Sequence, residues 1–212
     1  ANPAFPEGLG GRPYLDRYVY RVVPEQATLL TEFLTGGVDA YVAMPPGHAA
    51  RARERPGLRV VTFPYRGVLF AAWNTRIPKL GDARVRRALT LATNRRLIME
   101  GIQGGEPAVI NSGIPPFHFA FDPTLGDSLP FDPEGAASLL EEAGWADGDG
   151  DGIRENAQGE RLSLELLYHR NQERQEVAEI LQAQLREVGV DLRPRVLEFP
   201  AYMQAITAAE RP

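Results

Sequence analysis

Residues 74–95 read NTRIPKLGDARVRRALTLATNR, and this stretch predicts a helix that follows a proline. Asp82 is one of the residue types that cap helix N-termini. The apolar residues after it recur at helical spacing and would share one face, namely Val85, Ala88, Leu89 and Ala92. The arginines between them, Arg84, Arg86 and Arg87, would then lie on the flanks of that face. We interpret them as a solvated structural surface, so the stretch indicates a fold and does not mark a binding site.

The same stretch also carries a motif. Starting at Trp73, it contains Trp-Asn-Thr, a proline, Asp-x-Arg-Val-Arg-x-Ala-Leu and Ala-x-Asn-Arg, in that order. This order resembles the extracellular solute-binding proteins, family 5, which are the oligopeptide- and dipeptide-binding receptors of bacterial ABC importers. Further segments resemble the family in the same order, at Asn2–Phe5, Arg12–Asp16, Gly37–Ala40, Phe131–Glu134, Ala137–Trp145 and Gln182–Val190. Because these segments extend over nearly the whole chain, their number and order support the resemblance more than any one of them does.

The resemblance implies an α/β fold. Members of the family resemble a clamshell of the type II periplasmic-binding-protein kind, with two lobes joined at a hinge. The larger lobe is built from both chain ends, and the smaller, C-terminal lobe is a long insertion that residues 1–212 match. We therefore expect one α/β lobe with a mixed sheet and packed helices, as a fragment of a larger receptor. The chain stops short of the family's Gly-Trp-x-x-Asp segment, so the missing second lobe is an expected partner on the same polypeptide.

The resemblance also implies a function. A receptor of this family would capture peptides, or a similar small solute, and deliver them to the permease of an ABC importer. It would work at a periplasmic or cell-surface location, and it would not be an enzyme. Relatives carry oligopeptides, dipeptides, nickel, haem or oligosaccharides on one scaffold, so the fold alone does not name the solute.

Composition agrees with a folded protein of this kind. The 212 residues are 43% hydrophobic and 24% charged, which is ordinary for a globular chain and argues against disorder. The formal net charge of −5 gives no electrostatic reason to expect nucleic acid as a partner. No stretch approaches the ~20 apolar residues of a membrane span, and we expect no signal peptide in this chain. With no cysteine there is no disulfide, which is compatible with any compartment.

Periodicity predicts strands that alternate with helices. The expected strands are Arg17–Val23, Val38–Met44, Leu58–Phe63, Gly67–Trp73, Leu162–Leu166 and Val190–Glu198. The expected helices are Glu25–Thr35, Pro46–Arg55, Asp82–Ala92, Asn94–Gln103, one that starts at Asp132-Pro133, and Glu173–Val188. Between them, residues 104–130 form a long Gly/Pro-rich loop without a clear period, and loops of this length are usually functional or mobile.

The segment Tyr168, His169, Arg170 and Asn171 is the first candidate for solute binding. It follows the leucine-rich strand, and ligands of α/β sheets usually meet the loops at the carboxyl ends of strands. In dipeptide-binding relatives an arginine in this segment holds the peptide α-carboxylate, and Arg170 matches it. A guanidinium suits that task because it offers two parallel donors to one carboxylate. The alternatives are a surface arginine near a helix start and, for His169, a partly exposed polar residue.

Two further places are candidates for the cleft. The loop Asn111–Phe119 resembles the Pro-rich loop that borders the cleft in the family, and Pro115 and Pro116 would stiffen it. Phe117 could then stand as an aromatic wall, or it could be buried in a structural connector. Trp73 ends a predicted strand and belongs either to the core or to the cleft.

A metal-binding pattern lies inside the Asp/Gly-rich loop at residues 145–160. Oxygen ligands at alternate residues with glycines between them match a calcium loop, with Asp147, Asp149, Asp151, the carbonyl of Ile153, and Glu155. The twelfth position is Gln158 instead of a bidentate glutamate, so any affinity would be weak. The other interpretation is a cluster of Asp-Gly turns. No cofactor is required by the sequence, and Ca²⁺ is the one that it could hold.

Other classes of function fit less well. Ser112, His118 and Asp122 are close in sequence, but their spacing matches no nucleophile motif. The three histidines, His48, His118 and His169, have no metal-ligand spacing. The main alternative to a receptor is a stand-alone calcium-stabilised extracellular interaction domain, which would need the aspartate loop and an exposed apolar patch.

Overall fold

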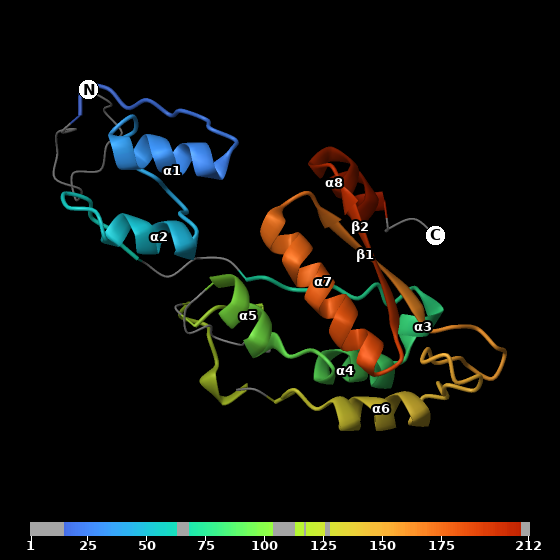
Figure 1. Ribbon diagram of the computed structural model, residues 1–212. Coiled ribbons are helices and arrows are strands. Elements are labelled where there is room, and N and C mark those ends of the chain that lie inside the picture. The colour runs from blue at the N-terminus through green and yellow to red at the C-terminus, as the bar shows by residue number, and fades with distance from the viewer. Residues whose placement is uncertain (1–14, 63–67, 104–112, 117, 126–127, 209–212) are drawn as a thin grey trace. The chain divides into compact units, whose positions relative to one another are not determined.

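The computed structural model describes residues 15–62, 68–103, 113–116, 118–125 and 128–208 (Figure 1). The chain divides into two compact units, Ala1–Val61 and Thr62–Pro212, and each is described by itself. That residues 1–212 form one lobe stays a prediction. The described residues leave out Phe117, the segment Asn2–Phe5 and, within the expected loop at 104–130, residues 104–112 and 126–127.

The first unit contains two helices, α1 (Gln26–Thr35) and α2 (Pro46–Arg53). Its buried side chains come from both helices and are Leu30, Phe33, Ala49 and Ala52. The ring of Phe33 meets Tyr41 edge-on, with 6.2 Å between the centroids. Helix α1 ends at Gly36, whose φ of +82° is left-handed and therefore suits a residue without a Cβ. The two predicted helices of this unit are confirmed, with α2 two residues shorter than expected.

The second unit holds the other elements. In chain order they are α3 (Pro78–Gly81), α4 (Ala83–Leu91), α5 (Arg95–Gln103), the short 3₁₀ helix η2 (Pro123–Leu125), α6 (Pro133–Glu142), β1 (Ser163–His169), α7 (Gln172–Glu187), β2 (Asp191–Leu197) and α8 (Phe199–Ala208). The predicted bounds of α4, α5 and α7 are correct to within one residue, and the predicted start of α6 is correct, whereas α3, η2 and α8 were not predicted.

Helix α4 shows why the opening stretch folds as it does. The Asp82 side chain accepts a hydrogen bond from the Arg84 backbone N–H at 2.8 Å and so caps the helix. The expected apolar face is buried in the core, where Val85, Ala88 and Leu89 are fully covered. The arginines serve the fold, since Arg84 pairs with Asp82 and Arg86 donates to the carbonyls of Leu80 and Gly81. Their structural interpretation is confirmed.

The sheet of the second unit consists of β1 and β2, which run parallel and are joined by α7. Their register runs from Ser163 opposite Asp191 to His169 opposite Leu197. Leu164 of β1 and Leu192 of β2 belong to the same buried cluster as Leu181 and Leu185 of α7. Helices α4 and α6 pack against each other and add Leu89 and Leu140 to this cluster, so one core supports the sheet.

The prediction of a mixed sheet was wrong for the described residues, whose only sheet is the parallel pair β1–β2. The segments Arg17–Val23, Val38–Met44, Leu58–Phe63 and Gly67–Trp73 form no strand in their described parts. Large side chains remain exposed there, including Tyr20 and Phe70. Ala43 also has a left-handed φ of +56°, which an extended strand does not allow. Apolar alternation favours an extended chain, but a strand also needs a neighbour that accepts its backbone hydrogen bonds.

Candidate functional site

The carboxyl edge of the sheet brings the first candidate residues together (Figure 1). Strand β1 ends at His169 and is followed at once by α7, while β2 ends at Leu197 and is followed by α8. The backbone N–H of Arg170 donates to the Leu197 carbonyl at 2.9 Å, so the ladder continues one residue past the strands. This bond places Arg170 beside Glu198. The edge therefore combines the ends of two strands with the starts of two helices, which is where α/β sheets usually bind ligands.

Arg170 is directed toward solvent at this edge and holds a single acid. Its Nε lies 2.6 Å from Oε1 of Glu198, and the side chains of the two residues are 70% and 68% exposed. The hydrogen bond that Arg170 donates to Glu198 raises the pKa of Arg170 above its ordinary value, so the guanidinium stays charged. An exposed ion pair adds little to stability, which leaves the arginine available for a role other than holding the fold.

The residues on either side of Arg170 make contacts that stabilise the local structure. Tyr168 and His169 are the last residues of β1 and not part of a loop, because the strand runs three residues further than expected. The His169 ring meets Phe199 and Tyr202 of α8 edge-on, at centroid distances of 5.4 and 5.6 Å. Asn171 caps α7 by accepting a hydrogen bond from the Arg174 N–H at 3.1 Å. These contacts hold the backbone on both sides of Arg170.

The other cleft candidates are positioned separately. Trp73 is half-buried and packs against the core cluster, as the first of its two interpretations expected. Pro115 is half-buried, and its carbonyl accepts a hydrogen bond from the His118 N–H at 2.9 Å. Phe117 lies outside the described residues. A role for Trp73, Pro115 or Phe117 in solute binding stays a prediction.

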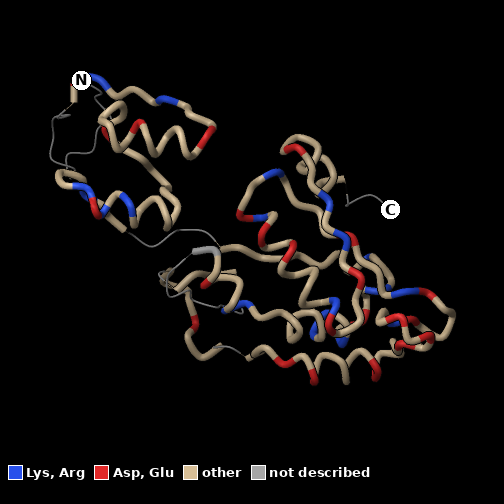
Figure 2. Tube along the Cα trace, viewed as in Figure 1, with Lys and Arg blue, Asp and Glu red and all other residues tan. Residues whose placement is uncertain are grey.

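The Asp/Gly-rich loop follows α6 along the chain, and acidic residues occur in both segments of the Cα trace (Figure 2). One carboxylate oxygen of each of Asp147, Asp149 and Asp151 lies within 4.8 Å of the others, and all three side chains are exposed. Backbone N–H groups of the loop already donate to them, for example from Gly150 to Asp147 at 2.8 Å. The Ile153 N–H and the Arg161 guanidinium, which lies 2.6 Å from Asp151, lower the pKa of that aspartate.

The other two predicted metal ligands occupy the inner side of the loop. Ile153 is fully buried and anchors the loop to the unit. Glu155 accepts a hydrogen bond from the Gly148 N–H through Oε2 at 3.2 Å, while its Oε1 is buried without a hydrogen-bond partner among the described residues. A buried carboxylate oxygen without a partner is costly, but Glu155 is not among the three carboxylates that lie within 4.8 Å of one another.

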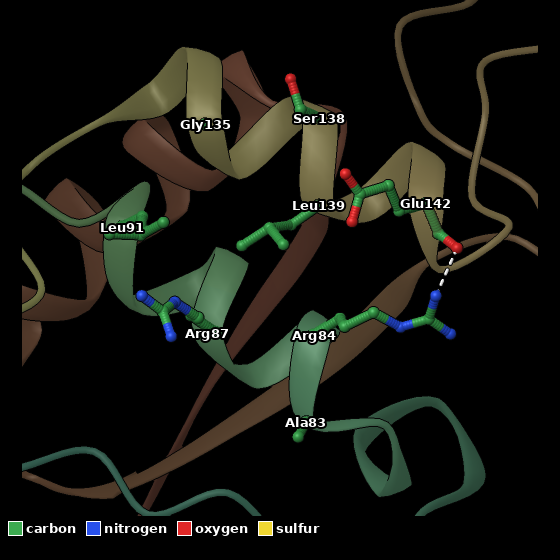
Figure 3. Close-up of a pocket in the computed structure, with 8 residues that line it drawn as sticks. All are labelled: Ala83, Arg84, Arg87, Leu91, Gly135, Ser138, Leu139 and Glu142. Carbon is green, nitrogen blue, oxygen red and sulfur yellow. Dashed lines mark hydrogen bonds between the residues drawn. The ribbon is translucent and has the colours of Figure 1, made fainter.

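A groove between α4 and α6 was not foreseen from the sequence (Figure 3). Its volume is about 560 Å³, and Arg84, Arg87, Leu139 and Glu142 contribute to its lining. The guanidinium of Arg84 is engaged by the Asp82 carboxylate and the Glu142 carbonyl. Leu139 packs against the core from the same seam. The groove thus follows the packing seam between two helices, and Arg87 lines it beside the paired Arg84.

Sequence comparison identifies the family to which this chain belongs. Residues 1–210 match the family described as bacterial extracellular solute-binding proteins, family 5, middle region. The chain belongs to this family, which is a family of binding proteins and not of enzymes.

Two curated relatives show the extent of the match. The oligopeptide-binding protein AppA of Bacillus subtilis is 26% identical over 196 residues, which are 92% of this chain and 36% of AppA. The dipeptide-binding protein of Escherichia coli is 25% identical over 201 residues, which are 95% of this chain and 36% of that protein. The chain thus spans about a third of the length of these relatives.

Solved structures agree on the fold. AppA from Bacillus subtilis in complex with a nonapeptide aligns with a TM-score of 0.75 at 25% identity, over 87% of this chain and 37% of AppA. NikA from Brucella suis in complex with Fe(III)-EDTA aligns with a TM-score of 0.67 at 24% identity, over 90% of this chain and 39% of NikA. The structure is therefore an α/β portion of a peptide-binding-protein fold. Among the residues described here, no helix is both long and apolar enough to cross a membrane.

Proposed function

We propose that this chain is part of a receptor that captures a peptide or a similar small solute outside the cytoplasmic membrane. The observation that carries the proposal is the family match over residues 1–210. AppA and the E. coli relative are named for binding oligopeptides and dipeptides, which favours a peptide as the solute. The receptor would be periplasmic or attached to the cell surface, and would deliver the solute to an ABC permease. Its second lobe would come from the rest of the polypeptide.

Within this receptor we assign solute contact to Arg170. Its guanidinium is charged, exposed and located where the backbone of both strands ends. Tyr168, His169 and Asn171 would border the bound solute from the same edge. A carboxylate is the solute group that fits, because an arginine can bind it through two parallel donors.

Replacing Arg170 by alanine in the full-length receptor tests the assignment. A solute that carries a free carboxylate should bind about 10- to 100-fold more weakly, since a hydrogen bond to a charged group is lost. The matched control is Arg195→Ala, which removes an exposed arginine that pairs with Glu165 on the same sheet at 3.2 Å. Calorimetry with a peptide in free-acid and C-terminally amidated form would measure both variants. Equal affinity of wild type and Arg170→Ala for the free acid contradicts the assignment.

We also propose that the loop Asp147–Glu155 binds Ca²⁺ weakly. Three clustered carboxylates and the unpartnered oxygen of Glu155 support this proposal. Because Arg161 already pairs with Asp151, a cation must compete with it. We therefore expect a dissociation constant of roughly 10⁻⁴–10⁻³ M, as in extracellular modules.

A calcium titration of wild type and of the double variant Asp149→Ala, Asp151→Ala separates the two interpretations of the loop. Calcium should raise the melting temperature of the wild type only. If calcium changed the melting temperature of the wild type and the double variant equally, the loop would be a cluster of Asp-Gly turns without a calcium site. A stand-alone calcium-stabilised interaction domain is the second candidate function, which the aspartate cluster alone favours. The family match over nearly the whole chain favours the receptor.

A further inference from the structure

Glu198 is fixed next to Arg170 by the backbone and not by the ion pair alone. The parallel register ends with His169 opposite Leu197, and the next ladder bond runs from the Arg170 N–H to the Leu197 carbonyl. On the other side, the Glu198 carbonyl accepts the Tyr202 N–H at 2.9 Å, which is the first hydrogen bond of α8. Glu198 therefore stands at the N-terminus of α8, a position that favours a carboxylate.

The contact between the two side chains uses only one side of the guanidinium. Glu198 Oε1 binds Nε of Arg170, and within the described part of the chain no hydrogen bond involves Nη1 or Nη2. These two nitrogens are the pair that binds a carboxylate end-on. Glu198 thus binds Arg170 at Nε and leaves Nη1 and Nη2 available for another acceptor.

We propose that Glu198 is a positioning residue, which orients Arg170 so that Nη1 and Nη2 face the carboxylate of the solute. The inference rests on the proposed function of Arg170 and adds a residue that was not predicted as part of the site. An arginine has many rotamers, and ordering it only when the solute binds would reduce the affinity. Glu198 restricts the side chain beforehand. The negative charge of Glu198 also repels a second carboxylate, but at about 70% exposure solvent screens this repulsion.

The test compares two substitutions at Glu198 in the full-length receptor. Glu198→Ala removes the acceptor, whereas Glu198→Gln keeps an oxygen for the Nε–H bond and removes the charge. The probes are a library of tripeptides prepared once as free acids and once as C-terminal amides, with binding measured by native mass spectrometry and calorimetry. Glu165→Ala is the matched control, because Glu165 is an exposed acid that pairs with an arginine across the same two strands.

The expected result is a loss of about two- to tenfold in affinity for free acids in Glu198→Ala, the cost of ordering one side chain. Glu198→Gln should bind like the wild type, and the amides should bind all four proteins alike. Free-acid binding that is unchanged or tighter in both Glu198 variants would overturn the positioning role. If Arg170→Ala binds free acids as the wild type does, the carboxylate contact itself is absent and the proposed function of Arg170 fails first.

Discussion

Two segments of the second unit have similar apolar sequences, but only one of them forms a strand. Gly67–Trp73 and Leu162–Leu166 are both rich in apolar residues, and both were predicted as strands. The second becomes β1, which pairs with β2 and buries Leu164 against α7. The described part of the first remains unpaired, with the Phe70 side chain 77% exposed.

The two segments differ in whether a neighbouring strand is available to pair with them. Helix α7 connects β1 to β2 directly, so the parallel neighbour of β1 comes from the next element of the chain. Gly67–Trp73 has no such neighbour among the described residues. A strand cannot satisfy its own backbone groups, whereas a helix can. Patterns of alternation are therefore reliable only where a second segment supplies the other half of the ladder.

The largest expected difference in stability is between truncation of a buried side chain in β1 and truncation of an exposed side chain in Gly67–Trp73. Leu164 is 6% exposed, and Leu164→Ala should lower the free energy of unfolding by about 2–5 kcal/mol. Phe70→Ala should change it by less than about 0.5 kcal/mol, because an exposed side chain buries little area. Urea titration followed by tryptophan fluorescence measures both, since Trp73 and Trp145 lie in this unit. Similar losses in the two variants would mean that Gly67–Trp73 is packed after all.

Loss of a helix cap should cost less, because a cap is a local contact. The Asp132 side chain accepts a hydrogen bond from the Gly135 N–H at 2.9 Å at the start of α6. Asp132→Ala should destabilise the unit by about 0.5–2 kcal/mol, while Asp132→Asn keeps the acceptor and should be nearly neutral. The same urea titration applies. If Asn were as damaging as Ala, the charge and not the hydrogen bond would be responsible.

The smallest effect on stability is expected when the pH is lowered and Asp191, at the start of β2, becomes protonated. Partial burial raises the pKa of Asp191, but hydrogen bonds from Ser163 and Arg193 together lower it below its usual range. A carboxyl with a lowered folded-state pKa contributes stability above its unfolded pKa of about 3.9. That contribution is lost as the pH falls through the folded value. Wild type should thus lose more stability between pH 5 and pH 2 than Asp191→Asn, as melting temperatures would show; parallel curves would contradict the account.

The sequence predicted best what depends on residues close to one another. Asp82, Asp132 with Pro133, and Gly36 each gave the correct end of a helix, because caps act within about four residues. The family motifs also indicated the class of protein, because each motif is a short string of residues and their order along the chain can be read without the fold. Four segments were predicted as strands from local sequence patterns and form no strand in their described parts, because a local pattern carries no information about a partner.

The candidate site shows the same division. Residue types and the position after a strand selected Arg170 as a solute contact, and this assignment still awaits its experiment. Only the tertiary structure placed Glu198 beside it, put Trp73 against the core and gathered the three aspartates. These contacts join residues that are distant in sequence or depend on how a loop closes. The sequence by itself therefore determined helices α1, α2, α4, α5 and α7, the start of α6, and the family. The paired strands and the partner of Arg170 were decided by tertiary structure, because their energy comes from contacts that exist only after distant segments have met.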